Sequence, residues 1–421
     1  MSIYAKKAFF SGSYVKQAIV FSNALFGLRN SSVALKHTIG SRSISELSGA
    51  KVETPEVKAV VYGKYGQPKE VLRALKYRLP PLTPTSIHLH FLAIPINPSD
   101  INQIEGVYPL RPPFTREEFG TDDAVAVAGN EGVAEVIGVG DQVKGFNVGD
   151  WAVMANAGFG TWRTHAVARP DQIVRIEPGS IDLASAATLT VNNATAYRML
   201  KDYVKLQKGD YVIQNGGNSG VSQAVIQIAK AWGINTINTI RKRPDFEQIK
   251  SRLQSLGVGE SGATTIVVSD EDLENKYRSK SQFLEFIGDE KANIPLGFNC
   301  VSGDSAIMIA KHLSRSGYLV TYGAMSRKPM RIPASMLIFD NLHFVGYWMA
   351  NWKETHSIEE YREMLDDIIA LIQTKKLGSF VYEENKWGEE TDEKELLAKF
   401  YEIFDKAYPD SHGVKQILRI H

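Results

Sequence analysis

Three glycines stand close together in the stretch from Asp210 to Arg243, where they could bind an anion. Gly216, Gly217 and Gly220 fall within five residues, and a glycine lets a ligand approach the backbone because it has no side chain. The segment before them is short and β-rich, and the apolar residues after them recur at helical spacing. A tight turn between a strand and a helix points free backbone N–H groups at an anion such as a phosphate. The stretch therefore predicts the first half of a dinucleotide-binding fold.

The glycine pattern departs from the strict dinucleotide motif. Asn218 and Val221 stand where G-x-G-x-x-G would place its second and third glycines. On this pattern alone, an ordinary turn between a strand and a helix remains an alternative. Strands are expected on either side of the turn and its helix, at residues 211–214 and 236–240.

Three cations, Arg241, Lys242 and Arg243, follow the second of these strands. In an NAD site this place carries Asp or Glu, which binds the ribose hydroxyls. Here the cations would attract a 2′-phosphate, and no carboxylate stands among them to repel it. The pattern predicts NADPH as the cofactor rather than NADH, with a solvated basic turn as the alternative.

The totals describe a chain with room for about two folded domains, because it has 421 residues. The net charge of +1 gives no overall electrostatic case for binding nucleic acid. The single cysteine, Cys300, excludes an internal disulfide and a cysteine-rich structural zinc site. No run of 18 apolar residues is present, so no membrane-spanning segment is expected.

Residues 1–45 differ in composition from the rest of the chain. They contain six Lys or Arg residues, nine serines and no Asp or Glu, together with a short apolar patch. This composition is typical of a mitochondrial transit peptide, and a merely disordered leader is the alternative. The end of the leader is approximate, and its cleavage point is not readable from the sequence.

A β-rich domain is expected at residues 46–190, because short strand-like segments alternate there with Gly-Asp and Pro turns. Asn97-Pro-Ser-Asp100, Gly129-Asn-Glu-Gly132 and Gly149-Asp150 occur in that order. The order resembles the medium-chain dehydrogenase/reductase superfamily. Zinc enzymes of that superfamily have Cys and His where this chain has Asn97 and Asn130. Since carboxamides are poor zinc ligands, no metal is expected.

Several further segments are similar to mitochondrial 2-enoyl thioester reductases, and the resemblance covers roughly residues 57 to 421. These segments are 101–109, 155–163, 194–200, 214–215, 218–221, 223–229, 241–244, 322–325 and 415–418. The resemblance implies an α/β fold, in which a Rossmann-type doubly wound parallel sheet domain (191–346) is inserted in a β-rich, GroES-like catalytic domain. The two parts of the catalytic domain would be residues 46–190 and 347–421.

The second half of the chain carries further local expectations. Four more strands are expected in the nucleotide sheet, and they are placed at residues 265–268, 296–301, 317–322 and 342–347. Ser305 is expected to cap a helix that ends at Leu313. Residues 270–290 are expected to be an irregular surface excursion. Residues 357–373 should form an amphipathic helix that leads back to the first domain, and 383–395 a solvated acidic loop.

The reaction implied by the resemblance is reduction of an α,β-unsaturated thioester. Hydride from NADPH goes to the β-carbon, and the α-carbon then takes a proton. Tyr108 matches the proton donor of the family, and a phenol suits this role because its pKa of about 10 keeps it protonated near neutrality. By composition alone Tyr108 is one of 17 tyrosines, so its role rests on the resemblance.

The resemblance also implies a cofactor site. The residues carried over onto this sequence are Asn192, Asn218, Ser219, Gly220, Val221, Arg241, Lys242, Arg243, Tyr322, Gly323, Ala324, Met325, Tyr347, Trp348, Met349 and Lys415. Asn218 to Val221 would hold the pyrophosphate, and Tyr322 to Met325 would line the nicotinamide side. For Tyr347 to Met349, plain core packing is the alternative.

The implied setting is mitochondrial type II fatty acid synthesis in the matrix, with substrates carried by acyl carrier protein or CoA and a homodimeric enzyme. A zinc-free, NADPH-dependent quinone or alkenal reductase of the same superfamily is one alternative. A non-enzymatic RNA-binding protein that keeps the fold is another, against which the balanced charge speaks. Neither chain-length preference nor the docking surface for acyl carrier protein is readable from the sequence.

Overall fold

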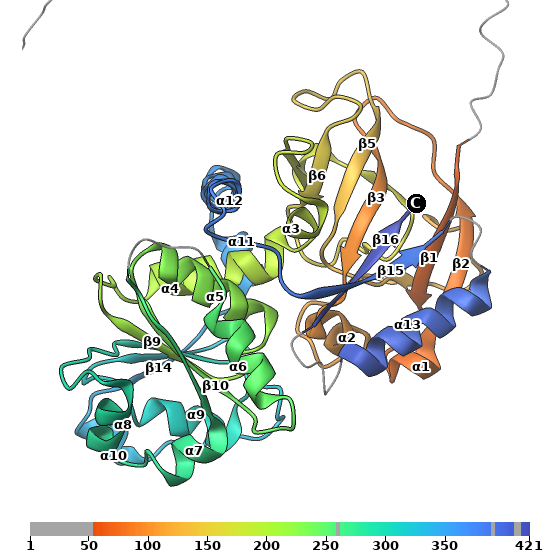
Figure 1. The fold of residues 1–421 in the computed structure, drawn as a ribbon. Coiled ribbons are helices and arrows are strands. Elements are labelled where there is room, and N and C mark those ends of the chain that lie inside the picture. Colours follow the sequence, from red (N-terminus) through yellow and green to blue (C-terminus); the bar gives the residue numbers. More distant parts are fainter. Residues whose placement is uncertain (1–53, 258–261, 389–391, 408–413) are drawn as a thin grey trace, which may run out of the picture. The chain divides into compact units, whose positions relative to one another are not determined.

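The computed structural model describes residues 54–257, 262–388, 392–407 and 414–421 (Figure 1). The predicted leader at 1–45 lies outside these residues. None of the described helices is both long and apolar enough to cross a membrane.

A six-stranded, all-parallel sheet contains the predicted nucleotide-binding strands. Its order is β11-β10-β9-β12-β13-β14, in which the first strand, β9, lies at the centre and later strands are added on both sides, as in a doubly wound fold. The bounds are β9 Tyr211–Gln214, β10 Asn235–Ile240, β11 Thr265–Ser269, β12 Leu296–Asn299, β13 Tyr318–Thr321 and β14 His343–Gly346. The six expected strands are confirmed, with shifts at their ends.

Helices cover both faces of this sheet (Figure 1). On one side lie α4 (Ala194–Asp202), α5 (Gly220–Ala231) and α6 (Phe246–Gln254), and on the other α7 (Asp270–Asn275), α8 (Lys280–Ile287), α9 (Gly303–Ala310) and α10 (Ala334–Ile338). Strands buried on both faces read as apolar runs, and Val212, Ile213 and Phe298 are fully buried here.

Two of the local expectations for this region are wrong. Residues 270–287 are largely helical, because Ser269 and Ser279 cap α7 and α8 by accepting backbone N–H groups from Asp272 and Gln282. The cap residue of α9 is Ser302, not Ser305. The turn before α9 places Ser302 at a φ of 69°, which periodicity alone does not reveal.

The β-rich part of the chain forms two further sheets. One has the order β15-β16-β3-β5-β6-β8, with β7 also paired to β3, and the other the order β2-β1-β4. The bounds are β1 Glu56–Tyr62, β2 Leu72–Arg78, β3 Ile87–Pro95, β4 Ala126–Val127, β5 Val133–Val139, β6 Trp151–Met154, β7 His165–Ala168, β8 Ile173–Ile176, β15 Tyr382–Trp387 and β16 Lys415–Ile420. Short helices stand between strands, namely α1 (Pro68–Val71), α2 (Pro98–Ile104) and α3 (Leu183–Ala187).

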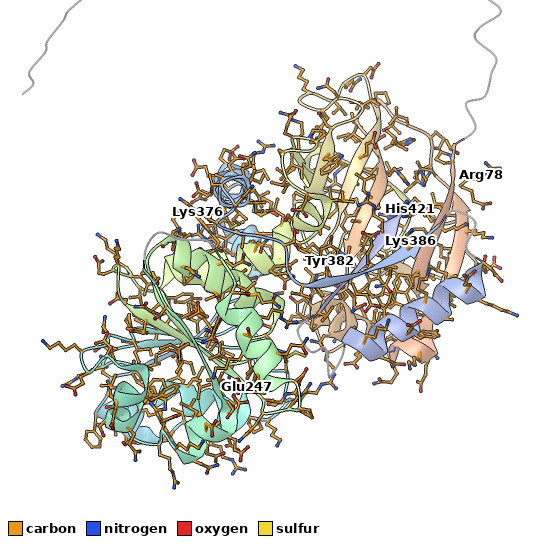
Figure 2. All side chains as sticks on the ribbon, in the orientation of Figure 1. Arg78, Glu247, Lys376, Tyr382, Lys386 and His421 are labelled. Atoms are coloured by element: carbon orange, nitrogen blue, oxygen red, sulfur yellow. The ribbon has the colours of Figure 1, made fainter. Side chains whose placement is uncertain are left out.

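The end of the chain returns to the β-rich part, as expected. After α11 (Met349–Thr355) and α12 (Ile358–Gln373), β16 pairs antiparallel with β3, and α13 (Glu393–Ala407) separates β15 from β16. Residues 382–387 form β15, so the expected acidic loop at 383–395 is wrong for that part. Tyr382 and Lys386, labelled in Figure 2, belong to this strand. It is anchored by Trp387, which is fully buried.

Candidate active site

Tyr108 lies just beyond the end of α2 and contacts Trp348, which follows β14, an edge strand of the nucleotide sheet. Its backbone N–H donates to the Asn102 carbonyl at 3.2 Å. The Nε1–H of Trp348 donates to the Tyr108 hydroxyl at 2.7 Å, and the two rings meet edge to face at 6.0 Å. Burial raises the pKa of Tyr108, the Trp348 hydrogen bond lowers it, and Asp100 raises it. The phenol therefore stays protonated at neutral pH and can donate a proton.

The helix that leads to Tyr108 is fixed by a buried carboxylate. The Asp100 side chain accepts from the Asn97 backbone N–H at 2.8 Å and from Asn130 Nδ2 at 2.7 Å. Pro98 begins the helix, where its missing N–H costs nothing. Burial raises the pKa of Asp100 to about 6, although these hydrogen bonds and Lys415 oppose the shift. Asn97 and Asn130 thus take part in a hydrogen-bond network.

Glu131 is the centre of that network and was not predicted as a site residue. Its carboxylate accepts from Asn97 Nδ2 at 3.0 Å, from the Val191 backbone N–H at 2.7 Å and from the Thr190 hydroxyl at 3.3 Å. Glu131 is 1% exposed. Burial raises its pKa, and the cations Lys415 and Lys353 are among the groups that lower it.

Lys353 was also missed, because it lies in an ordinary helical segment of the sequence. Its ammonium donates to the Met154 carbonyl at 3.4 Å and lies 4.7 Å from the centre of the Tyr361 ring. Burial lowers the pKa of Lys353 to about 8, and Glu131 opposes the shift. By contrast, Glu131 could have been found from the sequence, because it stands next to Asn130 in the Gly129-Asn-Glu-Gly132 motif.

Asn97 connects this network to two predicted cofactor residues. Asn192 Nδ2 donates to Asn97 Oδ1 at 3.1 Å, and Lys415 Nζ donates to the same oxygen. Burial lowers the pKa of Lys415, while Glu131 and Asp100 raise it. Asn192 belongs to the π-helical turn Leu189–Asn193. A Cβ on Gly220 would come within 3.3 Å of Asn192 Oδ1, so the network reaches the start of α5.

The predicted nucleotide turn has the shape of an anion cradle. Gly216 has a φ of 58°, and a Cβ there would lie 2.6 Å from Cys300 Sγ. A Cβ on Gly217 would lie 2.9 Å from Asn238. Ser219 caps the 12-residue helix α5 by accepting the Ser222 N–H. These close approaches explain the glycines and leave the helix N-terminus facing the turn, which fits a pyrophosphate.

The predicted cations begin directly after β10, as expected, but two carboxylates stand near them. Lys242 Nζ lies 3.7 Å from the Glu271 carboxylate. Burial raises the pKa of Asp270, and Arg241 is near enough to lower it. Both acids follow β11, which pairs with β10, so the sequence around Arg243 could not reveal them.

The two segments predicted beside the nicotinamide lie at neighbouring strand ends. Tyr322 to Met325 follow β13, where the Met325 N–H donates to the Cys300 carbonyl at 2.9 Å. Tyr347 follows β14, and its N–H donates to the Thr321 carbonyl at 2.9 Å. The carboxyl ends of parallel strands are where such folds bind ligands.

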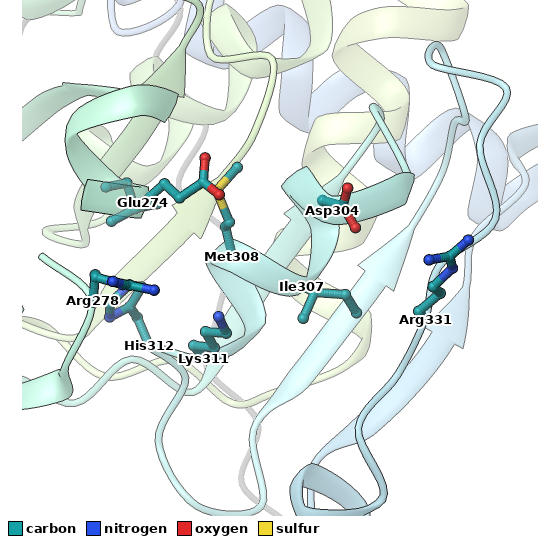
Figure 3. Close-up of a pocket in the computed structure, with 9 residues that line it drawn as sticks. Glu274, Arg278, Asp304, Ile307, Met308, Lys311, His312 and Arg331 are labelled. Carbon is teal, nitrogen blue, oxygen red and sulfur yellow. The ribbon is translucent and has the colours of Figure 1, made fainter.

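A pocket of about 220 Å³ between α7 and α9 is separate from this constellation (Figure 3). Leu273, Glu274, Arg278, Asp304, Ile307, Met308, Lys311, His312 and Arg331 line it. None of them is a predicted site residue. Across residues 54–257, 262–388, 392–407 and 414–421, no three His, Cys, Asp or Glu side chains are grouped to hold a metal ion. Metal-free chemistry stays a prediction.

Comparisons with known proteins give the family. Two family models match, an alcohol dehydrogenase GroES-like domain at residues 83–178 and a zinc-binding dehydrogenase at residues 220–370. The mitochondrial enoyl-acyl-carrier-protein reductase of Schizosaccharomyces pombe is 40% identical over 377 residues, which cover 89% of this chain and 97% of that protein.

Solved structures agree with this result. A complex of Etr1p with NADP and crotonyl-CoA is 34% identical, with a TM-score of 0.79, and covers 87% of this chain and 100% of that chain. The mitochondrial 2-enoyl thioester reductase heterodimer Etr1p/Etr2p from Candida tropicalis is 34% identical, with a TM-score of 0.78 and the same coverage. The chain therefore belongs to the mitochondrial enoyl-acyl-carrier-protein reductases, within the medium-chain dehydrogenase/reductase superfamily.

Proposed function

We propose that this protein reduces trans-2-enoyl thioesters to saturated acyl thioesters with NADPH. The observation that carries the proposal is the Tyr108 phenol, which is held by Trp348 next to a network that reaches the nucleotide turn. The homologous Etr1p was solved with NADP and crotonyl-CoA, which is an enoyl thioester. The protein is mitochondrial, like the relatives named so. We propose that it acts in the matrix, in fatty acid synthesis.

The reaction needs a hydride donor for the β-carbon, a thioester oxygen that holds negative charge, and a proton donor for the α-carbon. When bound, NADPH supplies the hydride to the β-carbon of the substrate. The C=C electron pair then moves towards the thioester oxygen, and it returns to form a C–H bond when the α-carbon takes the Tyr108 proton. The Trp348 N–H stabilises the phenolate that remains, because it already donates to that oxygen. Solvent returns the proton to Tyr108.

The cofactor residues are proposed as a set. Asn218, Ser219, Gly220 and Val221 bind the pyrophosphate, and Arg241, Lys242 and Arg243 bind the 2′-phosphate. Asn192 and Lys415 face the cofactor where the two parts of the chain meet. Tyr322 to Met325 and Tyr347 to Met349 line the nicotinamide. We also propose residues 191–346 as the cofactor domain, with 46–190 and 347–421 as the catalytic domain.

Replacing both Arg241 and Arg243 with alanine should raise KM for NADPH about 100-fold or more and leave KM for NADH nearly unchanged. Each charge-assisted bond to the 2′-phosphate is worth roughly 1.5–3 kcal/mol, and NADH lacks that group. Initial rates with each cofactor measure the change. Lys376→Ala, at an exposed cation after α12, is the control. Equal losses with both cofactors would show that the arginines do not bind the phosphate.

The function itself is tested by NADPH oxidation with a medium-chain trans-2-enoyl thioester, in parallel with a quinone and an alkenal. Residues 1–45 are removed for this assay. Turnover of the thioester but not of the quinone is expected. Turnover of the quinone alone would support the quinone reductase alternative. No turnover, together with RNA binding in moderate salt, would support the non-enzymatic one.

A homodimer is proposed through β14, which is the last strand of its sheet among the described residues. At the end of α10, shortly before β14 in the sequence, three consecutive large apolar side chains are exposed, Leu337 by 48%, Ile338 by 69% and Phe339 by 71%. A free strand edge with an apolar patch is a surface that another chain covers.

Replacing Ile338 and Phe339 with aspartate should therefore give monomers. Light scattering after size-exclusion chromatography measures the mass, and Val148→Asp, at another side chain that is 66% exposed, is the matched control. If the double variant kept the mass of a dimer, another surface would have to form the interface.

A further inference from the structure

Exposed cations surround the short segment that joins α2 to Tyr108. Arg327 Nη2 lies 2.7 Å from the Glu105 carboxylate, and Arg111 Nη2 donates to the Gly106 carbonyl at 3.1 Å. Lys328 is the neighbour of Arg327 along the chain. Lys64 precedes Tyr65, whose ring lies under the Arg111 guanidinium at 5.2 Å. We call Lys64, Arg111, Arg327 and Lys328 the cationic rim.

Tyr65 also fixes one side of this rim. A Cβ on Gly106 would come within 2.8 Å of Tyr65, and the Gly66 N–H donates to the Ile104 carbonyl at 3.1 Å. The loop that carries Lys64 therefore packs directly against the residues before Tyr108. On the other side, the Ser302 hydroxyl donates to the Lys328 carbonyl at 2.7 Å. The rim is thus held by two separate parts of the chain.

Two apolar side chains are exposed next to the cations. Val107, directly before Tyr108, is 66% exposed, and Met325, two residues before Arg327, is 39% exposed. An apolar centre bordered by charged residues is the usual anatomy of a protein interface.

The acids of this region cancel only part of the positive charge of the rim. Glu105 has a side chain that is only 9% exposed and is paired with Arg327. Glu118 is paired with Arg163 at 2.8 Å. Glu117, Asp122 and Asp123 lie in the loop closed by the Thr115–Val125 bridge, whose Phe119 packs on Tyr77 of β2 instead. Since the whole chain has a net charge of only +1, the excess at the rim is local.

We infer that the cationic rim docks an acidic acyl carrier protein when it presents the enoyl chain to Tyr108. The inference rests on the proposed function and adds the partner surface to it. A carrier protein that is acidic is attracted by the rim, and the attraction acts mainly on the rate of encounter. The thioester on its pantetheine arm must enter beside Tyr108, which the rim residues border.

The test is the double variant Lys64→Glu, Lys328→Glu. Neither lysine side chain makes a hydrogen bond or ion pair with another described residue, so the reversal of charge breaks no such contact. The same enoyl group is presented on acyl carrier protein, on CoA and on N-acetylcysteamine, which has no phosphate and no charge. The matched control is Lys375→Glu, Lys376→Glu, two exposed lysines after α12.

With acyl carrier protein, kcat/KM should fall about tenfold or more, and its decrease with added salt should disappear, because steering is screened by salt. The kcat value should not change. The N-acetylcysteamine substrate should react as with wild type, which also shows that the variant is folded. The control variant should behave as wild type with all three substrates.

Other results would overturn the inference. Equal losses with acyl carrier protein and CoA would mean that the rim binds phosphates of the thiol carrier and not a protein surface. An unchanged variant, or equal losses with all three substrates, would also exclude docking at the rim. If wild type reduces none of the three thioesters, the proposed function is wrong and the docking inference falls with it.

Discussion

Tyr108→Phe should lower kcat for an enoyl thioester by about 10²- to 10⁴-fold, the range typical for loss of a positioned proton donor. The phenylalanine keeps the ring that meets Trp348 edge to face, so the Kd for NADPH should change little. Because burial raises the pKa of the Tyr108 phenol, the phenol of wild type stays protonated as pH rises towards 10. We therefore expect no loss of activity from its ionisation below that pH. Single-turnover rates and a pH profile of kcat measure both effects.

Two further variants separate the proton from the packing. Tyr401→Phe removes the hydroxyl of another partly buried tyrosine, whose partner is the Leu72 carbonyl at 3.5 Å, and should retain wild-type rates. Trp348→Phe removes the N–H that donates to Tyr108 and should cost less than Tyr108→Phe. If Tyr108→Phe turned over as fast as wild type, another group would have to protonate the α-carbon, while the reaction class would stand.

Local patterns predicted the nucleotide sheet well because they depend on neighbours in the sequence. The β-rich segment at 211–214 is β9 to the residue. The glycines after it are explained by close approaches to Cys300 and Asn238. The capping serines of α7 and α8 were missed, although their spacing is visible, because the charged residues around them masked the helical pattern.

Contacts between distant residues could not be predicted in the same way. Tyr108 and Trp348 are 240 residues apart, and only the fold brings their polar atoms together. Asp270 and Glu271 reach the cations after β10 because β11 is its parallel neighbour. Lys353 has no sequence signature at all, since its role depends on a buried carboxylate more than 200 residues earlier.

Glu131→Gln should lower the affinity for NADPH and the free energy of unfolding, the latter by about 3 kcal/mol. Asn97 Oδ1 accepts from both Asn192 and Lys415, so its Nδ2 has to face an acceptor, which is Glu131. A glutamine can accept from Val191 with its oxygen, but its NH₂ then meets the Asn97 NH₂, donor against donor. Asn192 and Lys415 are thereby displaced from the proposed cofactor.

The same substitution removes the carboxylate that stabilises the Lys353 ammonium. The pKa of Lys353 in the folded variant should therefore fall below its wild-type value of about 8, while the unfolded chain keeps its ordinary value. At a pH between the Lys353 pKa of the folded variant and that of folded wild type, Lys353 is deprotonated in the variant and protonated in wild type. The stability deficit of the variant should accordingly be larger at pH 6 than at pH 8.

A second substitution, Lys353→Met, separates the two effects. The double variant no longer contains the Lys353 ammonium, so the free energy of unfolding should recover in part, while Lys415 keeps Asp100 as a neighbouring acid. The affinity for NADPH should not recover, because the Asn97 NH₂ still lacks the carboxylate acceptor. Denaturant unfolding at pH 6 and 8 and NADPH titration measure these quantities, with the exposed Glu354→Gln as control. Wild-type NADPH affinity in the double variant would show that Glu131 acts through Lys353 and does not hold the Asn97–Asn192 pair in place.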